Sequence, residues 1–271
     1  MKRIMVLSAG LLLSGVALAH VQIMVISEET VSGQKGAVRD IDIQFADHAM
    51  EIGPLLSMDR PKTCGVLVNG RKHDLRDALV ARQEAGKNAF SCTYSVTEPG
   101  AHVMYLEPAP YWDPSEEVVV THYAKVIFNS CGAGLKTKSA MGWENWEGWD
   151  AQVGFPVEIE PLVQCTSLWT GAEFRGVVRN EKGKPFPSCR IEVEYYNKDG
   201  AVAVPDASFI TQILKTDKNG VFSFVPVRAG WWGLTALPEM DKRVKGPQGN
   251  LVEAEIGGAL WIHAVDVTLR P

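Results

Sequence analysis

Histidine is the residue type in this chain whose placement best suits metal chemistry. Of the six histidines, the first, His20, directly follows the small residues Ala17-Leu18-Ala19. Cleavage after Ala19 would make His20 the first residue of the mature protein, with a free α-amine beside its imidazole. The amine has an ordinary pKa of about 7.7–8.0 and the imidazole one of about 6.5, so both nitrogens can bind a metal near neutral pH. The junction therefore predicts an N-terminal metal chelate.

Residues 1–19 have the three parts of a secretory signal peptide. Lys2 and Arg3 supply the positive start, residues 4–16 form an apolar core, and residues 17–19 form the cleavage site. The core is shorter than the roughly 20 residues that a membrane-spanning helix needs. An uncleaved N-terminal anchor is the alternative. We expect cleavage, a periplasmic location and a mature chain that does not span a membrane.

His48 is the second candidate metal ligand, at the end of a predicted strand in the run His-Ala-Met-Glu. Imidazole nitrogens suit nickel, copper and zinc. Lone histidines in strands or turns are more often structural residues than ligands, which is how we interpret the other four: His73, His102, His122 and His263.

Charge and motifs exclude several functions. The formal net charge of −5 argues against nucleic acid as a partner and is compatible with attracting cations. The sequence has no Gly-rich phosphate loop, no G-x-S-x-G and no H-E-x-x-H, so it does not indicate an enzyme.

Five cysteines lie after the predicted signal: Cys64, Cys92, Cys131, Cys165 and Cys189. In an oxidising compartment some of them should pair, although their odd number leaves at least one unpaired or intermolecular. Cys64 with Cys92 and Cys165 with Cys189 are plausible pairs, because each pair flanks a hairpin-like segment. Sequence alone does not fix the connectivity.

Short alternating segments predict an all-β fold of two antiparallel β-sandwich domains, immunoglobulin- or prealbumin-like. The first domain spans residues 20–152, with strands expected at 21–27, 37–45 and 116–129, among others, and a short helix at 74–86. The second spans residues 153–271 and shows strands separated by Gly-containing turns, with the last strand expected at 259–269.

A Trp-rich linker ends the first domain, with Trp143, Trp146 and Trp149 spaced by three among acidic residues. It is either a sugar- or cation-binding loop or a linker whose tryptophans pack at a domain interface, and we favour the second interpretation because Trp is mostly buried in proteins.

Several segments together resemble a known family. They are the His-Val-Gln-Ile-Met start at residues 20–24, Phe45 to His48, Met58 to Pro61, and Asn69 to Leu79, followed by segments 107–117, 123–129, 154–162, 168–178, 191–197 and 228–233. These resemble the periplasmic nickel- and cobalt-uptake accessory family of the NikK/NikM type, long catalogued as a domain of unknown function. The resemblance covers essentially the whole mature chain.

The resemblance implies an all-β, non-enzymatic protein that captures Ni²⁺ or Co²⁺ and assists inner-membrane nickel/cobalt transporter subunits of the energy-coupling type. His20 and His48 are the metal ligands that match its pattern. Two alternatives stay open. One is a Cu²⁺-binding protein or a histidine-brace copper oxidase, because an amine and two imidazoles also suit Cu²⁺. The other is a metal-free adhesion or ligand-binding module.

Overall fold

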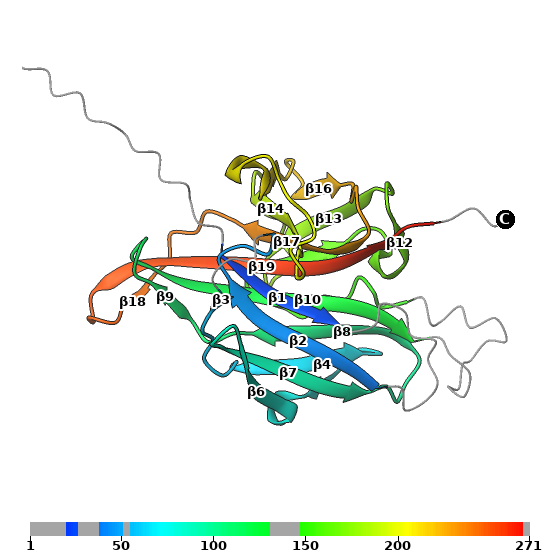
Figure 1. Cartoon of the computed structure of the whole chain (residues 1–271), viewed down its shortest axis with the longest axis horizontal. Coiled ribbons are helices and arrows are strands. Elements are labelled where there is room, and N and C mark those ends of the chain that lie inside the picture. The colour runs from blue at the N-terminus through cyan, green and yellow to red at the C-terminus, as the bar shows by residue number, and fades with distance from the viewer. Residues whose placement is uncertain (1–19, 27–37, 51–54, 131–146, 268–271) are drawn as a thin grey trace, which may run out of the picture.

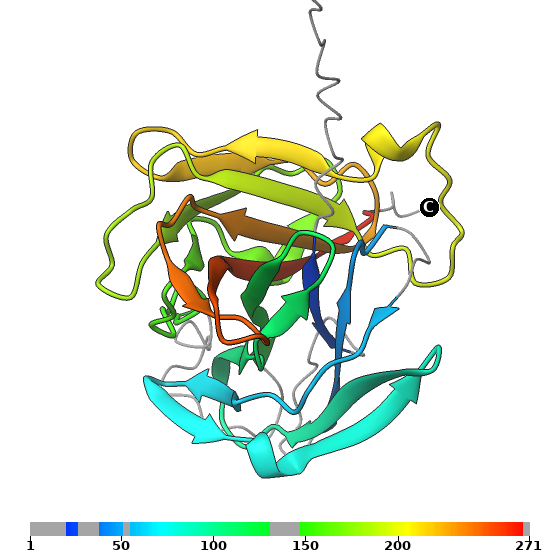
Figure 2. The ribbon, with the colours of Figure 1, turned by 90° about the vertical axis from the view of Figure 1, so that its left-hand side faces the viewer.

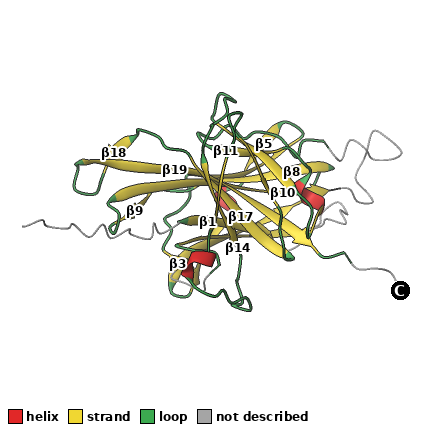
Figure 3. Ribbon diagram, turned by 90° about the horizontal axis from the view of Figure 1, so that it is seen from above, coloured by secondary structure: helices red, strands yellow, loops and turns green. Residues whose placement is uncertain are grey.

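The computed structural model describes residues 20–26, 38–50, 55–130 and 147–267, and β-strands make up most of them (Figure 1). Helical residues within these ranges are confined to single 3-10 turns at Arg76–Ala78 (η1), Cys165–Ser167 (η3) and Ala207–Phe209 (η4) (Figure 3). The expected all-β fold is confirmed. None of the helices found in these ranges has the length and hydropathy to cross a membrane. The predicted signal peptide, Cys131, Trp143 and Trp146 lie outside the described residues.

An outer sheet of five strands has His20 at one corner. Its order is β1-β2-β7-β6, with β3 also paired to β2. The strands are β1 (Val21–Ile26), β2 (Val38–Ala46), β3 (Leu55–Leu56), β6 (Leu79–Glu84) and β7 (Lys87–Ser95). His20 immediately precedes β1, an apolar strand whose six residues are all buried.

The prediction of a short helix at residues 74–86 is wrong. Residues 79–84 form strand β6, which pairs with β7 from Leu79↔Cys92 to Glu84↔Lys87. Ala85 and Gly86 have φ values of 47° and 77°, the left-handed conformation that a two-residue hairpin turn requires. Pairing within the sheet therefore outweighs the helical spacing of the apolar residues, and Val80, one of them, is 62% exposed.

A central sheet of eleven strands has the order β15-β14-β17-β19-β10-β8-β4-β5, with β12 and β18 also paired to β19 and β9 to β10. Its strands are β4 (Thr63–Val68), β5 (Arg71–Asp74), β8 (Gly100–Glu107), β9 (Tyr111–Asp113), β10 (Val118–Ser130), β12 (Leu168–Trp169), β14 (Arg190–Tyr195), β15 (Gln212–Lys215), β17 (Gly230–Leu237), β18 (Arg243–Lys245) and β19 (Leu251–Val265).

Strands from both sides of the predicted domain boundary at residue 152 meet in this sheet. β10 pairs in parallel with β19, from Val118↔Glu253 to Val126↔Trp261, so the sheet is mixed rather than purely antiparallel. The division into two domains stays a prediction.

A small sheet, β11 (Glu158–Pro161), β13 (Phe174–Arg179) and β16 (Val221–Phe224), packs against the central sheet from the side opposite the outer sheet. Figures 1 and 2 show β19 between the outer-sheet strand β2 and the small-sheet strand β13.

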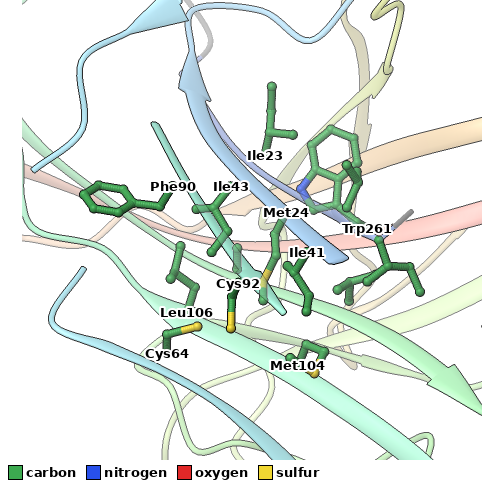
Figure 4. Packing of buried hydrophobic residues seen from close by; sticks show 14 of the residues in the cluster. Ile23, Met24, Ile41, Ile43, Cys64, Phe90, Cys92, Met104, Leu106 and Trp261 are labelled. Carbon is green, nitrogen blue, oxygen red and sulfur yellow. The ribbon is translucent and has the colours of Figure 1, made fainter. Parts of the chain in front are cut away.

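The two faces of the central sheet contribute to two separate cores. On β8, Met104 and Leu106 belong to a first core shared with the outer sheet (Figure 4). Their neighbours Val103 and Tyr105 belong to a second core shared with the small sheet. Side chains alternate between faces along a strand, so the register of β10 and β19 decides which polar residues face the outer sheet.

Candidate metal centre

His20 is buried at the start of β1, with 3% of its surface exposed. Its ring stacks on Phe45 of β2, with centroids 5.8 Å apart and ring planes 9° apart. The ring centroid of Tyr111 on β9 lies 6.0 Å from that of His20. The aromatic walls follow from the register, since Val21 pairs with Ala46 and therefore brings the chain before β1 beside the end of β2. His20 is thus a fixed, enclosed imidazole.

Two carboxylates face the His20 ring. Its Nε2 lies 3.4 Å from Oδ2 of Asp113 on β9, and its Nδ1 lies 4.0 Å from Oε1 of Glu255 on β19. Nδ1 has no hydrogen-bond partner. Nδ1 is also the ring nitrogen that, with the α-amine of an N-terminal histidine, closes a six-membered chelate ring around a metal.

His122 is a second buried imidazole in the same place, and sequence reasoning did not select it. It lies on β10 with 0% exposure, and alternation puts it on the same face as Val120 and Ala124 of the first core. Its Nε2 lies 2.9 Å from Glu255 Oε1. A carboxylate only accepts hydrogen bonds, so Nε2 carries the proton and a neutral ring has its lone pair on Nδ1. That Nδ1 also has no hydrogen-bond partner.

Glycine at position 257 makes room for the His122 ring. Gly257 is the cross-strand partner of His122 in the β10–β19 pair, and a Cβ there would lie 2.6 Å from His122 Cδ2. The next residue, Gly258, serves the opposite face, where a Cβ would lie 2.3 Å from the carbonyl oxygen of Val157. The Gly-Gly pair within an apolar strand was the available sequence signal for a crowded site.

The pKa values of these groups follow from burial and from their contacts. Burial lowers the pKa of His20, and the neighbouring His122 lowers it further, while Glu255 and Asp113 act in the opposite direction. Burial opposes ionisation of Glu255, but its hydrogen bond to His122 holds its pKa below the ordinary value. Asp113 is likewise desolvated, yet hydrogen bonds from Ser115 keep its pKa low. Asp113 and Glu255 therefore favour their ionised forms, whereas the lowered pKa of His20 favours its neutral form.

A third acidic side chain, Glu192 of β14, lies near His20. Both line a small pocket together with Glu194, Gly233 and Thr235. Glu192 is 5% exposed and its Oε2 has no hydrogen-bond partner. Burial raises the pKa of Glu192, so a cation bound nearby would favour its ionised form.

His48, the other predicted ligand, is held by a different carboxylate. Its Nδ1 lies 2.9 Å from Glu194 Oε1, and Glu194 also accepts hydrogen bonds from the backbone N–H of Ala49, at 2.6 Å, and from the Thr211 hydroxyl. Glu194 thereby ties the segment after β2 to β14. Glu194 connects His48 with the His20 pocket, whereas His122 and His20 both lie beside Glu255.

The remaining histidines are structural or exposed. His102 is buried, stacks on Phe128 at 4.8 Å and has its Nδ1 3.0 Å from the Gly100 carbonyl oxygen. His263 packs edge-on against Trp231 at 5.0 Å. His73 is exposed on β5. Trp149 is partly buried and packs against the second core.

A cavity of about 340 Å³ adjoins His122. Its walls include His122, Phe45 and Tyr111, together with Gln22, Met58 and Trp112. Glu255 lies on the border of a second, larger groove. His122 therefore borders one hollow and Glu255 the other, whereas His20 lines neither of them.

The histidine cluster as placed is not a complete metal site. Across the described ranges, no group of three or more His, Cys, Asp or Glu side chains is arranged to hold a metal. In the chain that still carries residues 1–19, the backbone nitrogen of His20 belongs to a peptide bond and cannot supply the amine ligand.

Comparison with known proteins adds a family but no activity. The curated proteins contain no significant match to this chain. Among solved structures, the D0-D1 domain of Intimin is 12% identical, with a TM-score of 0.25, over 91% of this chain and 100% of that one. The major pilin subunit of Bacillus cereus is 8% identical, with a TM-score of 0.21, over 92% of this chain and 69% of that one. Likenesses this weak carry no argument. A family model described as "Domain of unknown function (DUF4198)" matches residues 17–239, and the chain belongs to that family.

Proposed function

We propose that this protein is a periplasmic metal-binding protein that captures Ni²⁺ or Co²⁺ at His20 after export and assists an inner-membrane nickel/cobalt transporter. The metal, the location and the transporter come from the sequence resemblance and the predicted signal peptide. No catalytic step is part of the proposal.

One observation carries the proposal: two buried imidazoles each turn Nε2 towards a carboxylate and leave Nδ1 without a hydrogen bond. The pairs are His20 with Asp113 and His122 with Glu255. Metal-bound histidines almost always use one ring nitrogen for the metal and give the other to a carboxylate or carbonyl, which fixes the ring. A buried polar atom without a partner is costly, and two such nitrogens in one cluster support a role for them as metal donors.

The donor set suits a late transition metal. The α-amine and Nδ1 of processed His20 with Nδ1 of His122 would provide three nitrogen donors, and Glu192 and Glu255 would balance the cation's charge. Imidazole and amine nitrogens favour nickel, cobalt and copper over magnesium or calcium. The same three donors suit Cu²⁺, which makes copper binding the second candidate function.

The test is calorimetry on the processed protein, with His20 as its first residue, against Ni²⁺, Co²⁺, Cu²⁺ and Zn²⁺. We expect about one Ni²⁺ per chain. An added glycine before His20 removes the free amine next to the ring and should weaken binding at least tenfold. His122→Asn should do the same, whereas the exposed His73→Asn is the matched control and should leave affinity unchanged.

The outcomes separate the candidates. Much tighter binding of Cu²⁺ than of Ni²⁺, with an electron paramagnetic resonance spectrum showing three nitrogen ligands, would identify copper rather than nickel as the metal of the site. Affinity that is insensitive to both the added glycine and His122→Asn would reject this site. An absence of binding to every metal would favour a metal-free adhesion or ligand-binding module.

A further inference from the structure

Two buried cysteines face each other across the first core. Cys64 lies on β4 of the central sheet and Cys92 on β7 of the outer sheet, 1% and 2% exposed. Figure 4 shows their sulfur atoms turned towards one another, and each thiol is the main cause of the shift in the other's pKa. Both are free in this structure.

We propose that Cys64 and Cys92 form a disulfide that joins the outer sheet to the central sheet. A disulfide needs two cysteines whose Cβ atoms point at each other and whose sulfurs can approach to about 2.05 Å. Facing strands of two packed sheets provide this arrangement, and the bond replaces two buried thiols by an apolar link within the core. The proposal does not depend on metal binding.

The other two described cysteines lack this arrangement. Cys165 and Cys189 are buried in the second core. Burial is the main cause that raises the pKa of each to about 12, and neither thiol acts on the other. The Cys189 Sγ lies 3.4 Å from the carbonyl oxygen of Arg190. These two cysteines are therefore expected to stay reduced, which makes them internal controls.

The reaction is thiol–disulfide exchange with a disulfide-bearing oxidant. One cysteine thiolate attacks the oxidant's S–S bond, forms a mixed disulfide and releases one thiol. The second thiolate attacks the protein sulfur of that mixed disulfide and releases a second thiol, so two cysteines are oxidised and one oxidant disulfide is reduced. Because both thiols are buried in the folded chain, the exchange belongs to folding, before the sheets close.

The bond would stabilise the arrangement on which the histidine pair depends. His20 precedes the outer-sheet strand β1, whereas His122 and Glu255 lie on the central sheet. Cys92 is the cross-strand partner of Ile41, and Ile41 also pairs with Ile26. Ile26 lies at the end of β1 that is far from His20. The disulfide therefore holds the opposite end of the same two sheets. Closing a loop of roughly 30 residues should raise Tm by about 10 °C.

The test is peptide mapping of the protein purified from the periplasm and alkylated in denaturant without reduction. Trypsin cuts after Lys or Arg, so Cys64 falls in residues 63–71 and Cys92 in residues 88–125. We expect one linked peptide made of these two segments. Cys165 and Cys189 should carry the alkyl label.

A refolding experiment adds a second readout. The reduced chain, unfolded and refolded with glutathione disulfide, should gain the link and about 10 °C in Tm. Cys64→Ala/Cys92→Ala should gain nothing, whereas the matched variant Cys165→Ala/Cys189→Ala should gain as much as the wild type. Labelling of Cys64 and Cys92 in the exported protein, or a link from either to another cysteine, would overturn the assignment. An equal gain in Tm by Cys64→Ala/Cys92→Ala would also refute it.

Discussion

Replacing Gly257 by alanine tests whether His122 belongs to the metal site, because it changes the position of the ring without changing any candidate ligand. The added methyl group would lie 2.6 Å from His122 Cδ2, 3.0 Å from His122 Nε2 and 2.9 Å from Leu237 Cδ2. Real Cβ atoms essentially never approach other atoms below 3.0 Å, so the ring or the strand has to move. The ring has the greater freedom, and its movement breaks the 2.9 Å contact between His122 and Glu255.

The expected magnitudes follow from overpacking and from the lost orientation. Extra methyl groups in a packed core cost about 1–3 kcal/mol, partly offset by roughly 0.5–1 kcal/mol because alanine loses less backbone freedom than glycine on folding. We therefore expect a loss of about 1–2 kcal/mol in unfolding free energy without metal. Disturbing the group that orients a metal-bound histidine lowers affinity on the order of 10- to 100-fold.

Ni²⁺ calorimetry on the processed protein and urea denaturation of the metal-free protein measure the two effects separately. Gly246→Ala is the matched control. It adds the same methyl group next to β18, where the nearest atom is Val252 Cγ1 at 3.1 Å and no histidine is in contact. It should leave Ni²⁺ affinity within about twofold of the wild type. A folded Gly257→Ala variant with wild-type affinity would show that the orientation of His122 is irrelevant to binding, and the reasoning would fail.

Three further predictions concern other buried polar groups. His48→Ala should lower Ni²⁺ affinity less than His122→Asn in the same calorimetry, because His48 is bonded to Glu194; the reverse order would restore His48 as the second ligand. Burial lowers the pKa of His102 to about 4, against 6.5 when unfolded, so the unfolded chain binds more protons between these pH values. The unfolding free energy should therefore fall by about 3 kcal/mol as pH drops from 6.5 to 4, and denaturation of His102→Leu should lack this part of the loss; identical pH profiles would contradict the assignment. Lys125→Met should cost about 3–5 kcal/mol in urea denaturation, because it leaves Glu158 buried without its cation. Adding Glu158→Gln should recover part of that loss, and no recovery would show that the charge is not its cause.

Local patterns in the sequence were enough to find most strands but not the partners of His20. Alternation of apolar and polar residues located β1 and most of β10, because the face of the sheet on which a side chain lies depends on its position within its own strand. It failed at residues 74–86, where the turn at Ala85-Gly86 and pairing with β7 decide the structure. The second histidine was missed for a related reason. His122 meets Glu255 only because β10 pairs with β19, a segment more than a hundred residues later in the chain, and no local spacing records such a contact.

If the proposed function holds, the position of His20 links export to metal binding. The His20 ring is already enclosed by Phe45, Tyr111 and two carboxylates while the backbone nitrogen of His20 is still part of a peptide bond. Cleavage after Ala19 would therefore change little in the packing and would add one charged amine, of ordinary pKa about 7.7–8.0, beside an unpartnered ring nitrogen. Before cleavage the cluster has two imidazoles and its carboxylates but no chelating amine. A site that the fold prepares and the peptidase completes would bind metal tightly only after the chain has left the cytoplasm.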